Sequence, residues 1–158
     1  MAKQAKAAPG IKIVCQNRKA AFNYHLEDRW EAGMALKGTE VKSLRDGHAN
    51  LKDSFALVKP DGVYLLNCHI PPYKSGNQFN HEPTRTRKLL LHKHEIEKLF
   101  GKTETKGYLL IPTKIYFLKG IAKIELALAK GKKKYDKREV IRRREQEREA
   151  ARAIRRGK

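Results

Sequence analysis

The C-terminal end of the chain changes composition so sharply that it limits where a core can form. Residues 130–158 hold 14 Lys and Arg against five Asp and Glu, with one aromatic residue and hardly any large aliphatic ones. Such a segment cannot bury enough apolar surface to offset its own ordering entropy. It is nevertheless rich in Ala, Arg and Glu, and Glu139 and Arg143 are spaced i,i+4. We predict a basic tail over 130–158 that is disordered when free and helical against RNA, which leaves residues 11–129 to form the fold.

Residues 1–10 have no apolar period, and we expect a disordered leader there. The leader lacks the apolar stretch of a secretory signal, and no later segment reaches the length of a membrane span. The formal net charge of +19 favours a polyanionic partner. An anionic membrane would require a lipidation signal or a basic amphipathic helix with bulky apolar residues, and the sequence has neither. We therefore expect a cytoplasmic, nucleic-acid-binding protein with no membrane contact.

Short strand patterns dominate residues 11–129. The apolar runs with strand character are Ile11–Cys15, Trp30–Leu36, Ser54–Val58, Val63–Ile70, Lys88–Leu91, Tyr108–Ile111, Lys114–Leu118 and Ile121–Leu128. Tight-turn residues separate two pairs of them, at Lys59–Gly62 and Lys119–Gly120. Short helices are predicted over Thr39–Gly47 and His94–Phe100, the second ending at Gly101. The pattern predicts a mainly β fold with short helices, organised as a small antiparallel OB-like β-barrel.

Residues that could support catalysis or bind a metal do not occur in the required spacings. Gly101-Lys102-Thr103 lacks the earlier glycine of a phosphate-binding loop, and the His92–Glu95 stretch has Lys98 where a zinc-binding HExxH motif needs histidine. Cys15 and Cys68 lie in strand-like runs without a CxxC spacing, so we expect buried, reduced thiols. We predict a non-enzymatic protein with no cofactor and no metal.

Two basic clusters are candidate RNA contacts. Arg85-Thr-Arg87-Lys88 precedes an apolar run that would anchor it, and guanidinium groups bind phosphate oxygens in a bidentate way. The same pattern is typical of a charged sheet edge that protects against aggregation, and the cluster alone does not separate the two. Lys130–Arg138 combines lysines that neutralise phosphates with Tyr135, which can stack on a base. Pro71–Pro83, with Tyr73 and Phe79, is expected to be an exposed loop.

Several long blocks, taken in order, resemble the SsrA-binding protein family. They are Asn17-Arg-Lys-Ala20, Glu31-Ala-Gly33, Gly38-Thr-Glu-Val-Lys-Ser-Leu-Arg45, Asn50-Leu-Lys-Asp-Ser54, Pro83-Thr-Arg-Thr-Arg-Lys-Leu-Leu-Leu91 and Ala129-Lys-Gly-Lys-Lys-Lys-Tyr-Asp-Lys-Arg138. The resemblance implies a monomeric RNA-binding adaptor whose barrel grips the tRNA-like domain of tmRNA (SsrA RNA) and delivers it to stalled ribosomes for trans-translation. It also implies the 70S ribosome as a partner and, indirectly, elongation factor Tu and alanyl-tRNA synthetase.

The resemblance and the basic clusters together give a set of expected contact residues. Those expected to bind tmRNA are Asn17, Arg18, Lys19, Tyr24, Glu31, Arg45, Arg85, Arg87, Lys88, Leu91 and Lys123. For Leu91, ordinary core packing is the alternative. Those expected to contact the decoding centre and the empty mRNA channel are Lys130, Gly131, Lys132, Lys133, Lys134, Tyr135, Asp136, Lys137, Arg138, Arg142, Arg143 and Ile154. Two positions depart from the family pattern, because Phe22 and Tyr135 stand where relatives often have histidine. A decoding mechanism based on protonation at position 135 is therefore not expected here.

Overall fold

The computed structural model describes residues 10–76 and 80–157, apart from the side chains at 105 and 106. The predicted leader, except Gly10, and Phe79 of the predicted loop lie outside the described residues. In chain order the elements are β1 (Ile11–Gln16), α1 (Arg18–Asn23), β2 (Tyr24–Met34), α2 (Gly38–Arg45), β3 (Phe55–Lys59), β4 (Gly62–Leu66), β5 (Arg87–Leu90), α3 (Lys93–Lys106), β6 (Leu109–Leu118), β7 (Ile121–Gly131) and α4 (Lys134–Arg156).

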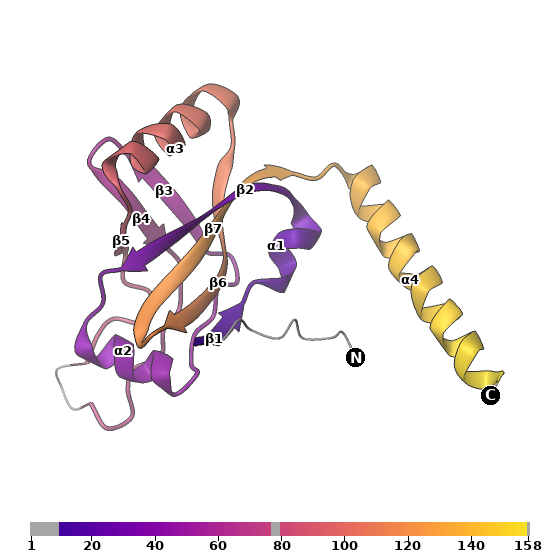
Figure 1. The fold of residues 1–158 in the computed structure, drawn as a ribbon, viewed down its shortest axis with the longest axis horizontal. Coiled ribbons are helices and arrows are strands. Elements are labelled where there is room, and N and C mark those ends of the chain that lie inside the picture. The colour runs from indigo at the N-terminus through magenta and orange to yellow at the C-terminus, as the bar shows by residue number, and fades with distance from the viewer. Residues whose placement is uncertain (1–9, 77–79, 158) are drawn as a thin grey trace.

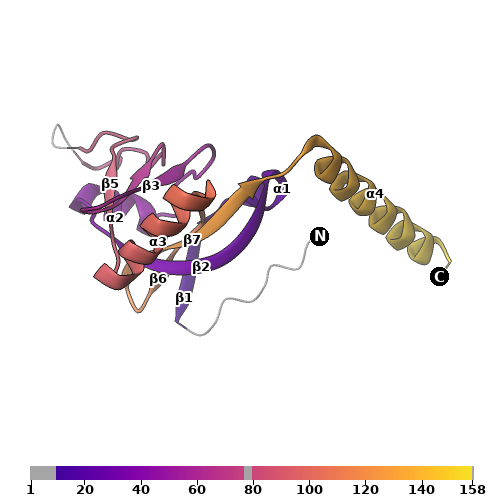
Figure 2. The same cartoon turned by 90° about the horizontal axis from the view of Figure 1, so that it is seen from above.

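The seven strands form one antiparallel sheet in the order β1-β6-β3-β4-β5-β2-β7. Because β6 also pairs with β7, strands β2 to β7 close into a ring, and β1 is added beside β6 (Figures 1 and 2). The length of β6 allows this, since its Leu110 pairs with Ala56 of β3 while Lys114 to Leu118 pair with β1. The predicted small antiparallel barrel is confirmed.

Alternation along β7 shows how the sequence fills this barrel. Ile124, Leu126 and Leu128 are buried in the main core, whereas Lys123 and Glu125 lie on the outer face. Burying each such aliphatic side chain contributes about 1.5–3 kcal/mol relative to leaving it exposed. The turn before β7 was also predicted correctly. Lys119 and Gly120 have φ values of 50° and 80°, the left-handed pair that a two-residue hairpin requires.

Several sequence-based boundaries were wrong. Strand β2 begins at Tyr24 and not at Trp30, and the strand predicted over Val63–Ile70 ends at Leu66. Two others were wrong for local reasons. The runs at 108–111 and 114–118 form the single strand β6, because a register shift after Pro112 accommodates the missing N–H of proline within the ladder. Helix α3 does not end at Gly101 but continues to Lys106. Its C-terminal cap is Gly107, whose φ of 64° is the left-handed conformation that commonly ends helices.

Helix α1 was not predicted at all. It occupies Arg18–Asn23 between β1 and β2, and its one buried residue, Ala20, packs with Ile111 and Ala129 in a small second cluster. The amide N–H of Asn17 donates to the carbonyl of Thr113 at 2.7 Å, which fixes the start of α1 against β6. A helix of six residues gives too short a pattern to be recognised from apolar spacing.

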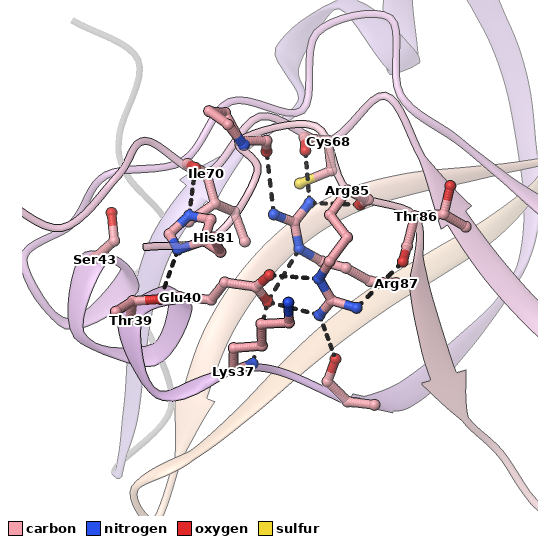
Figure 3. Close-up of polar contacts among 12 residues, drawn as sticks. Lys37, Thr39, Glu40, Ser43, Cys68, Ile70, His81, Arg85, Thr86 and Arg87 are labelled. Atoms are coloured by element: carbon pink, nitrogen blue, oxygen red, sulfur yellow. Dashed lines mark hydrogen bonds and ion pairs between the residues drawn. The ribbon is translucent and has the colours of Figure 1, made fainter. Parts of the chain in front are cut away.

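Helix α2 is held against the barrel by a buried ion network (Figure 3). The Glu40 carboxylate is fully buried and accepts two hydrogen bonds from Arg85, at 2.8 Å from Nε and 3.0 Å from Nη2. Arg87, also fully buried, places Nε at an ion-pair distance of 3.2 Å from Glu40 without hydrogen-bond alignment. Its two other nitrogens donate to the carbonyls of Cys68, Arg85 and Pro83.

A histidine completes the attachment of α2. Buried His81 contacts the Thr39 hydroxyl through Nδ1 and the Ile70 carbonyl through Nε2, both at 2.8 Å (Figure 3). The Ser43 hydroxyl donates to the Pro71 carbonyl at 2.8 Å. Nearly every buried polar group of α2 thus bonds to the segment between β4 and β5, which fixes that segment on the barrel.

The basic tail is a single helix, α4, that extends away from the barrel (Figures 1 and 2). Strand β7 continues to Gly131, so the barrel ends two residues later than the predicted boundary at 129. Helix α4 has no buried residue. Its helical conformation agrees with the local propensities of the sequence, while the disorder expected of the free tail stays a prediction.

Two further findings concern the class of the protein. No helix within residues 10–76 and 80–157 combines the length and the hydropathy that crossing a membrane requires. Cys15 and Cys68 are free thiols, half-buried and buried respectively. Burial raises the pKa of Cys15 to about 11 and that of Cys68 to about 12.

Candidate RNA-binding surface

An open groove of about 870 Å³ lies where β2, β5 and β7 meet the start of α3. Three of the residues predicted to bind RNA line it, namely Glu31 of β2, Leu91 just after β5 and Lys123 of β7. Antiparallel pairing of β2 with β7 brings this about, because Gly33 lies opposite Lys123 and Glu31 lies opposite Glu125. Three segments that are distant in sequence thus place an anion, a cation and an apolar side chain in one groove.

The Glu31 side chain is 46% exposed at this groove, and its carboxylate is held from one side. The Tyr116 hydroxyl donates a hydrogen bond to Glu31 Oε2, and Lys123 Nζ lies 3.8 Å from Oε1. Burial and this hydrogen bond raise the pKa of Tyr116 well above its usual value, so the phenol stays protonated and remains a donor. Sequence reasoning missed Tyr116, whose position next to Glu31 depends on the pairing of β6 with β7.

Glu125 lies directly opposite Glu31, where two carboxylates would normally repel each other. Its own partners compensate its charge: Arg29 Nη1 at 2.7 Å, the Thr113 hydroxyl at 2.7 Å and Lys114 Nζ at 3.3 Å. Burial alone would raise the pKa of Glu125, but the hydrogen bonds from Thr113 and Arg29 and the charge of Lys114 outweigh it and lower the pKa. Glu125 is therefore a neutralised part of the sheet, whereas Glu31 lines the groove.

Apolar side chains form part of the remaining groove wall, together with Arg29, His92 and Glu95. Leu90 and Ile121 are both exposed there, and Trp30 lies under the ammonium group of Lys102, 5.5 Å from the ring centroid. Leu91 is half-buried and packs against the main core while lining the groove, so it has both of the roles considered for it. Apolar side chains beside hydrogen-bonding and charged groups suit the unstacked bases of RNA loops.

A second, smaller hollow of about 410 Å³ contains three more of the predicted residues: Asn17, Lys19 and Tyr24. Phe55 and Leu109, which were not predicted, contribute exposed apolar surface to it. The Asn17 amide nitrogen already donates to the carbonyls of Leu51 and Pro112, at 3.4 and 3.2 Å. The Asn17 side chain therefore ties the start of α1 to its neighbours, while Lys19 is exposed and Tyr24 is half-buried; RNA contacts of all three stay predictions.

The structure separates the other predicted barrel contacts from these hollows. Arg18, Arg45 and Lys88 are exposed and line neither of them. The prediction that Arg87 contacts RNA is wrong, because its guanidinium is fully buried and is occupied by Glu40 and three backbone carbonyls. Arg85 is partly exposed, but both oxygens of Glu40 hold its guanidinium. The RNA contact of Arg85 therefore stays a prediction, whereas buried Arg87 fits neither the RNA contact nor the charged-edge alternative.

The predicted decoding-centre segment begins at the end of β7 and continues into α4. Lys130 Nζ lies 4.8 Å from the ring centroid of Tyr108, and Lys132 donates from its backbone N–H to Asn23 and from Nζ to Ala21. Asp136 lies 3.3 Å from His25 Nε2. Gly131 is the last residue of β7. The other predicted residues of this segment follow Lys132, as Lys133 and then, within α4, Lys134, Tyr135, Lys137, Arg138, Arg142, Arg143 and Ile154.

The two positions that depart from the family pattern occupy different surroundings. Tyr135 is 69% exposed, and a hydrogen bond with Glu139 raises its pKa, so it is an uncharged, accessible ring at neutral pH. Phe22 of α1 lies beside the tail, with the Arg144 guanidinium 5.7 Å from its ring centroid. Contacts from α1 and β2 thus meet the first turns of α4, which sets the direction in which the tail leaves the barrel (Figure 1).

Among the described residues, no three His, Cys, Asp or Glu side chains come together as a possible metal site. The molecule combines a closed antiparallel barrel, a net charge of +19, hollows that join apolar and charged groups, and a basic helical extension. Together these features define a small basic β-barrel protein of the nucleic-acid-binding class.

Comparison with known proteins identifies the family within that class. The SmpB protein family matches residues 14–156, so the chain belongs to this family. It is 59% identical over 146 residues to the SsrA-binding protein of Geobacter sulfurreducens, covering 92% of this chain and 95% of that protein. The corresponding identity with the SsrA-binding protein of Desulforudis audaxviator is 62% over 144 residues, covering 91% and 94%.

A solved structure gives the same assignment. A chain from a study described as "tmRNA-SmpB: a journey to the center of the bacterial ribosome" superimposes with a TM-score of 0.65 at 49% identity. The superposition covers 82% of this chain and 94% of that one. The predicted resemblance to the SsrA-binding protein family is confirmed.

Proposed function

We propose that this chain is a non-enzymatic adaptor that binds the tRNA-like domain of tmRNA and delivers it to stalled ribosomes in the cytoplasm for trans-translation. The barrel would carry the contacts with tmRNA, and the basic tail would contact the decoding centre and the empty mRNA channel. Elongation factor Tu and alanyl-tRNA synthetase would act with it indirectly, through the tmRNA that they share. The protein would work as a monomer and without a cofactor.

The observation that carries the proposal is the groove that joins Glu31, Leu91 and Lys123 in a member of the SmpB family. A carboxylate accepts hydrogen bonds from base N–H groups and from the ribose 2′-hydroxyl, a lysine binds phosphate, and apolar side chains pack against unstacked bases. RNA loops offer all three partners, whereas the bases of a regular duplex stay stacked and their major-groove edges are out of reach of side chains. The groove is therefore suited to the loops of a tRNA-like domain.

Properties of α4 support the proposed role of the tail. Its 23 residues would extend about 35 Å at about 1.5 Å per residue. Its surface is basic and has no buried residue. In a channel made of ribosomal RNA, the basic side chains of such a helix would bind phosphates that the message contacts when it is present. Their binding would release the counterions of those phosphates. A message that fills the channel would compete for this space, so binding of the tail would report an empty channel.

A competitive binding titration tests the proposal. Wild-type protein is titrated with tmRNA at two salt concentrations, with total tRNA as competitor, beside Glu31→Arg and the control Glu82→Arg. Both variants reverse one exposed carboxylate, but Glu82 lines neither hollow. We expect tight, competitor-resistant binding that is lost in Glu31→Arg and kept in Glu82→Arg. Weak binding that depends steeply on salt and is indifferent to both variants would instead indicate general coating of RNA.

A further inference from the structure

Tyr116 of β6 is buried and donates a hydrogen bond to Glu31, which lines the groove. Only 4% of this tyrosine is exposed. It lies opposite Lys123 of β7, and β7 pairs on its other side with β2, which carries Glu31. Lys114 Nζ lies 5.6 Å from its ring centroid and also contacts Glu125, so the ring is fixed by its surroundings. A buried phenol needs a hydrogen-bond partner, and Glu31 Oε2 is the acceptor that it reaches.

We propose that Tyr116 is a positioning residue for RNA recognition, which fixes the Glu31 carboxylate in the orientation that presents it to the groove. The inference rests on the proposed function. With Oε2 held by the Tyr116 hydroxyl and Oε1 near Lys123, the carboxylate has one defined orientation at the floor of the groove. Its free lone pairs then accept hydrogen bonds from an RNA N–H or 2′-hydroxyl without first losing rotational freedom.

The charged neighbours of Glu31 do not by themselves hold its carboxylate in this orientation. Lys123 Nζ lies 3.8 Å from its carboxylate, while Arg29 and Lys114 pair instead with Glu125 on the opposite strand position. Without the hydroxyl of Tyr116, the Glu31 side chain would sample several orientations, some toward Lys123 and some toward solvent. One loose ion pair stabilises a half-exposed carboxylate too weakly to select one of them. The RNA ligand would then have to order the side chain itself, which lowers affinity.

The test is a double-mutant cycle in tmRNA binding with Tyr116→Phe and Glu31→Gln. Trp30, the single tryptophan of the chain, lines the groove and supplies the fluorescence signal. Tyr64→Phe is the matched control, since it also removes a tyrosine–carboxylate hydrogen bond, to Asp61 at 2.7 Å, but lies outside the groove. We expect Tyr116→Phe to weaken binding by about tenfold, and the double variant to bind no more weakly than Glu31→Gln alone. Tyr64→Phe should stay within about twofold of wild type.

A second variant covers the case in which Tyr116→Phe disturbs folding. Glu31→Asp keeps the charge but shortens the side chain by one methylene group, which removes its carboxylate from the reach of Tyr116. It should also weaken binding by about tenfold, with an unchanged thermal unfolding midpoint.

Wild-type affinity in either Tyr116→Phe or Glu31→Asp would overturn the inference, and so would additive effects in the cycle. If the wild-type protein shows no preference for tmRNA over total tRNA, the proposed function fails. If Glu31→Gln weakens tmRNA binding but Tyr116→Phe does not, only the inference about Tyr116 fails.

Discussion

Replacing Glu40 with glutamine should destabilise the barrel strongly, because it removes the charge and turns one of two accepting oxygens into an NH2 donor that faces Arg85. Glu40 and Arg87 are both fully buried, so Glu40→Gln leaves the Arg87 cation in the core without its anion. Removing one partner of a buried ion pair costs about 3–5 kcal/mol. Total stability of such a domain is about 5–15 kcal/mol, so the loss is a large fraction of it. At about 2–4 °C per kcal/mol, a loss of about 3 kcal/mol lowers the unfolding midpoint by about 6–12 °C.

The assay is urea unfolding followed by Trp30 fluorescence and circular dichroism, with Glu31→Gln as the matched control. Glu31 is half-exposed, so the same substitution there should cost less than about 1 kcal/mol. A Glu40→Gln protein within about 1 kcal/mol of wild type would show that Arg85 and Arg87 do not depend on this carboxylate, and would refute the reasoning.

The same network has a defined pH dependence. Burial alone would raise the pKa of Glu40, but the hydrogen bonds from Arg85 and the charge of Arg87 outweigh it and hold the pKa below the ordinary value of 4.5. A lowered pKa in the folded protein means that the stabilisation is complete above pH 4.5 and is lost as the pH falls through the folded value. The stability difference between wild type and Glu40→Gln should therefore shrink as the pH falls below 4.5, and a difference that grows there would contradict the account.

Three further predictions concern the tail, one turn and the thiols. Deleting 135–158 should spare tmRNA binding, measured by titration, but abolish tagging of peptides on stalled ribosomes; lost tmRNA binding would contradict separate roles for barrel and tail. Gly120→Val should cost about 1–2 kcal/mol in urea unfolding, because φ there is 80°, whereas valine at exposed Gly101, inside α3, should cost less than at Gly120. Cys15 and Cys68, with pKa values raised to about 11 and 12, should react with a thiol reagent at pH 8 far more slowly in the native protein than in urea; equal rates would show that burial does not protect them.

Local patterns were sufficient for most of the fold. Alternation identified most strands of the barrel, and Lys119–Gly120 identified the turn between β6 and β7, because both signals depend on neighbours in sequence. The helical tendency of the tail is local for the same reason, and α4 follows it. Pattern reasoning failed where an element was too short, as for α1, or where a residue broke a helix pattern without ending the helix, as Gly101 does in α3.

The candidate site was harder to predict, because its chemistry depends on contacts between distant segments. Arg87 looks like a surface cation in sequence, and only the approach of Glu40 on α2 makes its burial possible. Tyr116 carries no motif, and its link to Glu31 follows from the pairing of β6 with β7 and of β7 with β2. Glu31, Leu91 and Lys123 were selected through family resemblance, and the register of the strands explains why they lie in one groove.

The most direct test of the central proposal is tag addition on stalled ribosomes in a purified translation system that contains tmRNA. Ribosomes are stalled on messages that end in the P site or extend progressively further into the channel, with full-length protein, with the protein lacking 135–158, or without protein. We predict efficient tag addition only with full-length protein, declining as the message fills the channel. Tag addition at the same rate without the protein, or at a rate independent of message length, would contradict the account.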